Sequence, residues 1–275
     1  MIRLLITLLV FAITVQPQPK PAPAPSAPAQ ARAFLPSTHG FRFPNRFRGV
    51  PLPASLRDKN SAVAAIFRAA LADAKLPDRF GLCGGMSAAA ADFFWADLPR
   101  PDATSPPVQG TPLYEYLHAR QMDSLGDELL MVLKFWQWMN LPDAAEEGQS
   151  TASLTAAEVP IITARLREKG LVPVGLVYVK HSRNAAAAGS RAGALWDNHQ
   201  VLAYASSEPA PGTTIFRIYD PNYPDDDGVT VTVRTVEGGI RCELRAGGGK
   251  VRAVRGIFGM PYARVTPPRA LSGGK

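Results

Sequence analysis

One cysteine in this chain stands where its thiol can act as a nucleophile. Cys83 lies between Gly81 and the pair Gly84-Gly85, immediately before a helical stretch. The amino-terminal end of a helix carries partial positive charge, which favours a thiolate over a thiol. The glycines beside it would let the backbone of a substrate approach closely. The alternative is a buried structural cysteine, which is common in proteins.

A histidine and an aspartate are placed to support that thiol. His199 begins an apolar strand and Asp220 ends the next one. If the polar segment 206–213 is the loop between them and Ala205 pairs with Thr214, His199 lies opposite Asp220, with Cβ atoms within about 5.5 Å. A carboxylate there fixes the imidazole tautomer and stabilises imidazolium. The alternatives are backbone contacts for the histidine and a turn role for the aspartate.

The three segments FGLCGGM, NHQVLAY and IYDPN resemble the papain-like cysteine peptidase superfamily. In that superfamily a cysteine at the start of a helix is followed by a histidine on a strand and by Asp or Asn at the next strand. The histidine and Asp-Pro segments most resemble the bacteriocin-processing (double-glycine) peptidases, and the resemblance covers roughly residues 77–235. It implies that Cys83 is the nucleophile, His199 the base and acid, and Asp220 the orienting residue.

The oxyanion hole departs from the family pattern. The family usually carries a glutamine about six residues before the cysteine, where this chain has Pro77. The backbone N–H of Cys83 can donate, and Asn45 and Arg79 are the candidates for a second donor. A missing donor would cost ~10²–10³ in rate. A catalytically degenerate papain-like binding domain is therefore one alternative.

The patterns around these residues predict an α+β domain, because helical segments come first and strands later. By resemblance the fold is papain-like, with N-terminal helices and the nucleophile helix packed on a C-terminal antiparallel sheet. The predicted helices are 61–75, Cys83 to about 97, one or two over 113–139, and one from the capping box Thr155-x-x-Glu158 to Gly170. The predicted strands are 172–179, 199–205, 214–220, 228–235 and 251–260. Over 113–139 the expected buried residues are Leu117, Met122, Leu125, Leu129, Leu133 and Trp136.

The N-terminal part is expected to be a targeting segment followed by a spacer. Residues 1–15 contain an apolar run behind Arg3 that is too short for a membrane span and typical of a signal-peptide h-region. An uncleaved N-terminal anchor is the alternative. Residues 16–33 are rich in Pro and Ala and predict an extended spacer. One papain-like domain, 34–275, would follow, starting with an extended surface segment over 34–58, in a secreted or periplasmic protein.

Composition excludes several classes of protein. The 275 residues carry a net charge of +7, and 46% of them are hydrophobic, which excludes a wholly disordered chain. Two cysteines without Cys/His metal spacing exclude a zinc finger, and no cofactor or metal is expected. No apolar run reaches the ~18 residues of a membrane helix, so no stable membrane span is expected.

Charge patterns bear on the partners of the chain. The basic C-terminal part would attract anionic envelope polymers through unspecific charge. No nucleic-acid reader motif accompanies it, so nucleic acid is not an expected partner, and no oligomeric state is predicted. The run Asp225-Asp226-Asp227-Gly228 predicts a DG hairpin turn, since it does not match a calcium-binding EF-hand loop.

Together these features predict a secreted thiol hydrolase that cleaves an amide or peptide bond through a thioester on Cys83. A peptide or a cell-wall peptide is the expected substrate. Besides the degenerate binding domain, a second alternative is a secreted structural protein with a disulfide between Cys83 and Cys242, which an oxidising compartment permits.

Overall fold

The computed structural model describes residues 32–48, 79–127, 130–180 and 194–274. The chain divides into two units, Met1–Ala33 and Phe34–Lys275, and every described helix and strand lies in the second. Of the predicted signal segment 1–15 and spacer 16–33, only residues 32 and 33 are described. The predicted helix at 61–75, Pro77 and Leu129 also lie outside the described residues.

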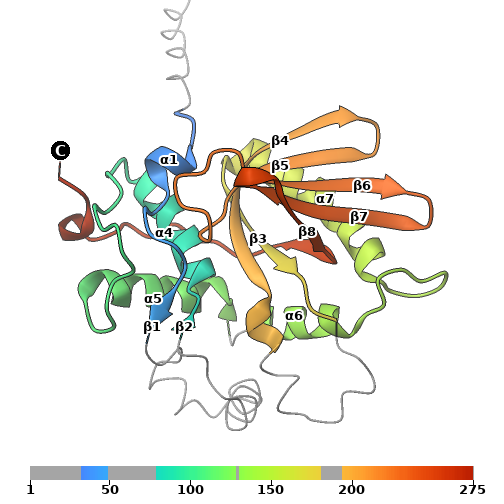
Figure 1. Ribbon diagram of the computed structural model, residues 1–275, viewed down its shortest axis with the longest axis horizontal. Coiled ribbons are helices and arrows are strands. Elements are labelled where there is room, and N and C mark those ends of the chain that lie inside the picture. Colours follow the sequence, from blue (N-terminus) through green and yellow to red (C-terminus); the bar gives the residue numbers. More distant parts are fainter. Residues whose placement is uncertain (1–31, 49–78, 128–129, 181–193, 275) are drawn as a thin grey trace, which may run out of the picture. The chain divides into compact units, whose positions relative to one another are not determined.

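The described part of the second unit combines helices with a curled antiparallel sheet, so the predicted mixed α+β class is confirmed (Figure 1). The helices are α1 (Pro36–His39), α4 (Cys83–Trp95), α5 (Pro112–Ser124), α6 (Leu130–Asn140) and α7 (Thr151–Lys169). The strands are β1 (Phe47–Arg48), β2 (Arg79–Phe80), β3 (Val172–Val177), β4 (His199–Ala210), β5 (Thr213–Tyr219), β6 (Thr230–Val236), β7 (Gly239–Ala246), β8 (Lys250–Val254) and β9 (Gly256–Gly259). A short 3₁₀ turn, η2 (Ala194–Asp197), precedes β4.

The main sheet has seven strands in the order β8-β7-β6-β5-β4-β3-β9. The predicted single strand 251–260 is therefore wrong, because it is two strands at opposite edges of this sheet. Only Arg255 separates β8 from β9, so the sheet must curl until its two edges meet at this residue. The backbone N–H of Arg255 donates to Val177 O on β3, which fixes the junction.

In the described part of the chain, apolar side chains fill three clusters around the sheet. The largest lies between α7 and the strands, the second surrounds α4, and the third joins α6 to β3 and β9. Helix α4 is buried from Gly84 to Phe94, as expected for a helix that is apolar on all sides. It packs against α5 and β4, and this packing places its first residue beside the first residue of β4.

The described part of the segment 34–58 is not the surface segment that the sequence predicted. Phe34, Phe41, Phe43 and Phe47 are all less than 5% exposed. Their rings form edge or tilted contacts with one another and with α4, for example Phe41 with Phe93 at 6.3 Å between centroids. The segment is irregular and buries its aromatic side chains one at a time. Its sequence therefore shows no helical or strand periodicity of apolar residues from which their burial could be predicted.

Helix α7 begins earlier than the predicted capping box at Thr155. Ser150 Oγ accepts from the N–H of Ser153, and Ser153 Oγ accepts from the N–H of Ser150, so this pair forms the capping box. Thr155 Oγ1 and Glu158 Oε2 instead accept backbone N–H groups of β9, from Ile257 and Gly259. The predicted end is confirmed, since Gly170 follows the helix with φ of 76°.

The segment 113–139 forms two helices, α5 and α6, with the buried face of α6 shifted from the predicted one. Leu117 and Leu125 are buried as predicted, and Met122 is half-buried. Leu133 is 36% exposed and Trp136 only partly buried. The buried residues of α6 are Val132, Phe135, Trp138 and Met139. Because α6 packs on β3, its buried residues are those on the side that faces this strand. None of the described helices is long and apolar enough to cross a membrane.

Candidate active site

Cys83 is the first residue of α4, as the sequence predicted, and residues outside the helix cap this end. The N–H of Leu82 donates to Asn45 Oδ1 at 2.6 Å, and the N–H of Gly85 donates to Gln121 Oε1 at 3.0 Å. Within the described residues, no acceptor faces the N–H of Cys83 or of Gly84. Of the two, Cys83 lines a cavity, so its N–H is the donor that remains for a ligand beside the thiol.

The glycines around Cys83 make room for protein groups. A Cβ on Gly85 would lie 2.1 Å from Leu117 O, and one on Gly84 would lie 2.2 Å from Ser124 Oγ. Both glycines thus allow α5 to pack against the start of α4. A Cβ on Gly81 would lie 2.6 Å from Asn45 Nδ2. The sequence predicted that these glycines let the backbone of a substrate approach, but at Gly84 and Gly85 the close neighbours are protein groups.

His199 and Asp220 are in direct contact. Nε2 of His199 lies 2.6 Å from Oδ1 of Asp220, and the two residues are 6% and 1% exposed. The same Oδ1 accepts the N–H of Asn222 at 2.8 Å, and Asn222 Nδ2 lies 3.1 Å from His199 Nε2. Sequence reasoning missed Asn222, although the turn sequence Asp-Pro-Asn could have indicated it. These contacts hold the imidazole in one orientation.

The strand pairing behind this contact differs from the predicted one. Ala205 pairs with Arg217 rather than Thr214, and β4 continues to Ala210, so 206–213 is not a loop. Near the site Leu202 pairs with Tyr219, a slip of two residues from the predicted register. Because side chains alternate with period two, an even slip leaves His199 and Asp220 on the same face.

The surroundings of His199 favour its protonated form. Burial disfavours the imidazolium, but the Asp220 carboxylate outweighs burial and, with a smaller contribution from Cys83, raises the pKa of His199 to about 10. Nε2 is engaged by Asp220, so Nδ1 is the ring nitrogen left for the Cys83 sulfur. At neutral pH this arrangement holds an imidazolium beside the sulfur.

Cys83 and His199 line one cavity of about 560 Å³. Its polar wall also includes Asn45, Gln121, Gln200 and Asn222. Its apolar wall includes Met122, Leu125, Val132, Phe135, Leu195 and Trp196. The sequence has no glutamine shortly before the cysteine, but packing of α5 and β4 brings Gln121 and Gln200 to it. Gln200 Oε1 is buried without a hydrogen-bond partner in the described structure.

Both candidate second donors lie on this cavity wall, but they are held differently. Asn45 donates its backbone N–H to Pro221 O at 2.9 Å and accepts at Oδ1 from Leu82, which leaves Nδ2 beside Gly81. Arg79 begins β2 opposite Arg48 of β1 and is exposed. Asn45 is therefore the more rigidly placed of the two.

The two thiols are free, so the alternative disulfide between them is not formed. Cys83 is half-buried at the cavity, whereas Cys242 is buried in the sheet core on β7. Burial raises the pKa of Cys242 to about 12. Cys242 is thus a protonated core thiol at neutral pH.

The acidic side chains in the run after β5 bind other segments of the chain through an ion pair and hydrogen bonds. Asp225 pairs with Arg100, Asp226 accepts the N–H groups of Gly228 and Gly247, and Asp227 accepts from Ser37. The connection between β5 and β6 is longer than the predicted DG hairpin turn, and its left-handed residue is Asp225, with φ of 57°. Among the described residues, no three His, Cys, Asp or Glu side chains converge to hold a metal ion.

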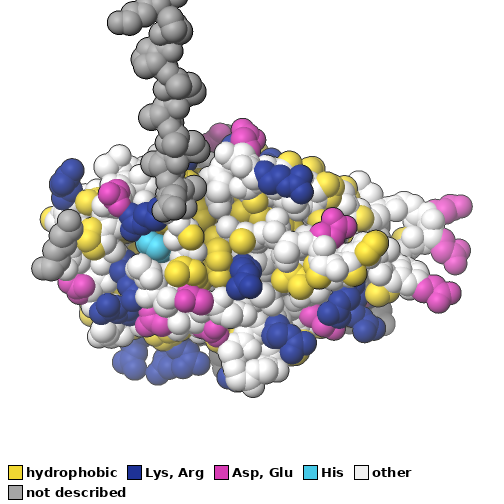
Figure 2. Space-filling view, turned by 90° about the horizontal axis from the view of Figure 1, so that it is seen from above, with side chains coloured by type: hydrophobic (Ala, Val, Ile, Leu, Met, Phe, Trp, Pro, Cys, Tyr) yellow, Lys and Arg dark blue, Asp and Glu magenta, His cyan; other side chains and the backbone are white. Residues whose placement is uncertain are grey.

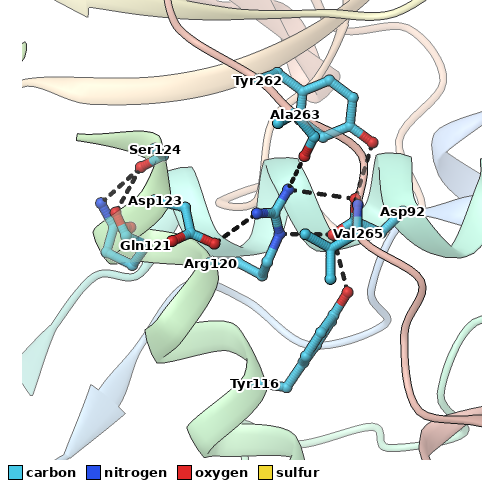
Figure 3. Close-up of polar contacts among 9 residues, drawn as sticks. All are labelled: Asp92, Tyr116, Arg120, Gln121, Asp123, Ser124, Tyr262, Ala263 and Val265. Carbon is cyan, nitrogen blue, oxygen red and sulfur yellow. Dashed lines mark hydrogen bonds and ion pairs between the residues drawn. The ribbon is translucent and has the colours of Figure 1, made fainter. Parts of the chain in front are cut away.

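A second buried cluster lies farther along α4 (Figure 3). Asp92 pairs with Arg120 of α5 at 2.6 Å and accepts from the hydroxyls of Tyr116 and Tyr262 and the N–H of Val265. Burial raises the pKa of Asp92, and these hydrogen bonds and Arg120 oppose the rise. The cluster attaches the C-terminal segment to α4 and α5, and it lies off the cavity wall.

No protein-family model, curated protein or solved structure matches this chain.

Proposed function

We propose that this chain is a secreted or periplasmic thiol hydrolase of the papain-like type, which cleaves an amide or peptide bond through a thioester on Cys83. The observation that carries the proposal is the Asp220–His199 pair, which shares the wall of one cavity with Cys83, the first residue of a helix. A helix that starts at the nucleophile and packs on the strand that carries the histidine also supports the papain-like fold.

In the first half of the proposed reaction the Cys83 thiolate attacks the carbonyl carbon of the substrate. A C–S bond forms and the carbonyl electron pair moves to oxygen, which becomes an oxyanion. When the oxyanion collapses, the C–N bond breaks and His199 gives its proton to the leaving amine. The products of this half are the free amine, neutral His199 and a thioester on Cys83.

In the second half water is the nucleophile. Neutral His199 takes a proton from the water as the oxygen bonds to the thioester carbon. The C–S bond then breaks, which releases the carboxylic acid and restores the thiolate beside imidazolium. Asp220 accepts from Nε2 throughout and keeps Nδ1 directed at the reacting groups.

Asn45 is the residue we assign to the oxyanion, together with the N–H of Cys83. Its Oδ1 is occupied by Leu82, so its Nδ2 is the group that remains for a ligand, close to the start of α4. Within the described residues Nδ2 has no acceptor. A preorganised amide of this kind contributes ~10²–10³ in rate.

The experiment is a digest of a mixed peptide library, read by mass spectrometry for new termini. Wild-type protein should produce cleavages that Cys83→Ala does not, and Asn45→Ala should produce them ~10²-fold or more slowly. The binding-domain alternative would hold if a thiol-directed epoxide labels Cys83 in the wild type but the digest matches that of Cys83→Ala.

A further inference from the structure

The charged residues on the cavity wall are mostly of one sign. Arg46, Arg79 and Arg252 line the cavity together with Cys83, and Asp197 is the only carboxylate among its lining residues in the described structure. Arg46 and Arg79 come from the neighbouring segments of β1 and β2, whereas Arg252 comes from β8 in the main sheet. Two separate parts of the fold therefore bring cations to the same cavity.

These three arginines have no acidic partner within the described residues. The basic residues that do form ion pairs there are Arg100, Arg120, Lys134, Lys180, His199, Arg234 and Arg255. On the face shown in Figure 2, basic side chains are interspersed with acidic ones. The cavity therefore presents three guanidinium groups that no described carboxylate neutralises, on the same wall as the Cys83 thiol.

Arg252 is held in place. Its guanidinium carbon lies 3.5 Å from the ring centroid of Tyr178, the residue that follows β3. Arg252 and Cys83 line the same cavity, so the stack lies on the wall that also carries the proposed nucleophile. Stacking fixes the plane of the guanidinium and leaves its N–H groups at the edge free for a ligand.

We propose that the cavity selects a peptide or amide substrate that carries a carboxylate close to the bond cleaved at Cys83. Arg252 binds this carboxylate, and Arg46 and Arg79 add a positive field that draws the anionic substrate into the cavity. The apolar wall formed by Met122, Leu125 and Phe135 contacts the alkyl part of the substrate. This inference rests on the proposed function, because it assigns the substrate class of the same thiol.

The test compares two alkylating probes of similar size and different charge. Iodoacetate and iodoacetamide both alkylate a thiolate with loss of iodide, but only iodoacetate is anionic. The ratio of their second-order rate constants at Cys83 cancels any change in the reactivity of the sulfur itself. We expect Arg252→Gln to lower this ratio about threefold to tenfold, and Arg46→Gln or Arg79→Gln to lower it less.

The matched control is Arg241→Gln, which removes the same charge from an exposed position on β7, outside the cavity. This variant should leave the ratio unchanged. An unchanged ratio, both in Arg252→Gln and in a variant that combines Arg46→Gln, Arg79→Gln and Arg252→Gln, would overturn the substrate assignment while leaving the thiol reactive. Loss of selective alkylation at Cys83 with both probes would instead mark a failure of the proposed function.

A second arm identifies the source of the carboxylate. Three short peptides are compared for protection of Cys83 against iodoacetamide: one with an internal Glu and a C-terminal amide, one with Gln and an amide, and one with Gln and a free C-terminus. Protection by the first alone indicates a side-chain carboxylate, and protection by the third indicates a C-terminal one. Equal protection by all three would contradict the proposal.

Discussion

Asp220 acts on His199 through a single oxygen atom at 2.6 Å, in a place where both side chains are almost fully buried. A carboxylate without its imidazolium partner would be costly there, and so would an imidazolium without its carboxylate. The proposed chemistry therefore depends on this pair more than on any other contact at the site. A change to either residue should alter both the activity and the protonation of the other.

Asp220→Asn should fold and should retain part of the proposed hydrolase activity. Asn can still accept a hydrogen bond from the imidazole, but it cannot stabilise the imidazolium by charge. We expect kcat/KM to fall about 10- to 100-fold, less than in Cys83→Ala. Circular dichroism is the control, and loss of soluble protein would assign Asp220 a role in the turn instead.

The pKa of His199 should be measurable by NMR of its ring protons. The group should stay protonated well above the ~6.5 of a free histidine, and Asp220→Asn should lower its pKa. Cys83→Ala should lower it by a smaller amount, because Asp220 remains. A titration near ~6.5 in the wild type would contradict the pairing.

The raised pKa of His199 also determines how stability depends on pH. The variant Cys83→Ala is used because no thiol then titrates beside His199. In this variant the folded state binds the His199 proton more tightly than the unfolded state. The stabilisation is complete below about pH 6.5 and is lost as the pH rises through the folded pKa, with a slope of at most ~1.4 kcal/mol per pH unit. Denaturant unfolding across this range should show the slope in Cys83→Ala and a smaller one once Asp220→Asn is added.

At the level of elements, the packing of α5 against the start of α4 positions Cys83. Gly85→Ala would place a methyl group 2.1 Å from Leu117 O, so the two helices must separate or shift. We expect a loss of about 1–3 kcal/mol in the free energy of unfolding and slower alkylation of Cys83. Gly274→Ala, whose Cβ would meet only Asp102 at 4.0 Å, is the control. Equal stability of the two variants would show that this contact is not a constraint.

The elements that the sequence predicted well are those fixed by local signals. The start of α4 at Cys83, the end of α7 at Gly170 and the apolar strands depend on residues within a few positions of one another. The predicted start of α7 was wrong because Ser150 and Thr155 both begin sequences that can cap a helix, and only the position of β9 distinguishes them. The split of 251–260 could not be predicted, since it depends on closure of the whole sheet.

In the candidate site as well, features that depend on nearby residues were predicted and features that depend on distant packing were missed. The face shared by His199 and Asp220 was predicted from alternation, and the error in register did not change it because the slip was even. The roles of Gln121 and Asn222 were missed because they come from distant packing and from a turn. The sequence made Asn45 only one of two candidates, and the folded structure shows the contact with Leu82 that places it.

At the level of the whole molecule, Arg255 joins the two edges of the sheet to the helices. Its guanidinium donates to Val179 O and Leu141 O and pairs with Asp143. Arg255→Gln should lower the free energy of unfolding by about 2–4 kcal/mol, because it leaves partly buried carbonyl groups without donors. Arg245→Gln, at an exposed position on β7, should change it by less than about 0.5 kcal/mol. Equal effects in chemical denaturation would show that sheet closure does not depend on Arg255.

If Cys83 and His199 act as one nucleophilic pair, the rate at which iodoacetamide alkylates Cys83 must depend on His199. Rates are measured on folded, unreduced protein across about pH 5–10 and assigned by peptide mass, with the buried Cys242 as the internal reference. We predict that Cys83 reacts at mildly acidic pH at least ~10-fold faster than a free thiol, that Cys242 does not react, and that His199→Ala removes the advantage. A Cys83 that reacts no faster than a free thiol, with the same pH profile in His199→Ala, would contradict the account.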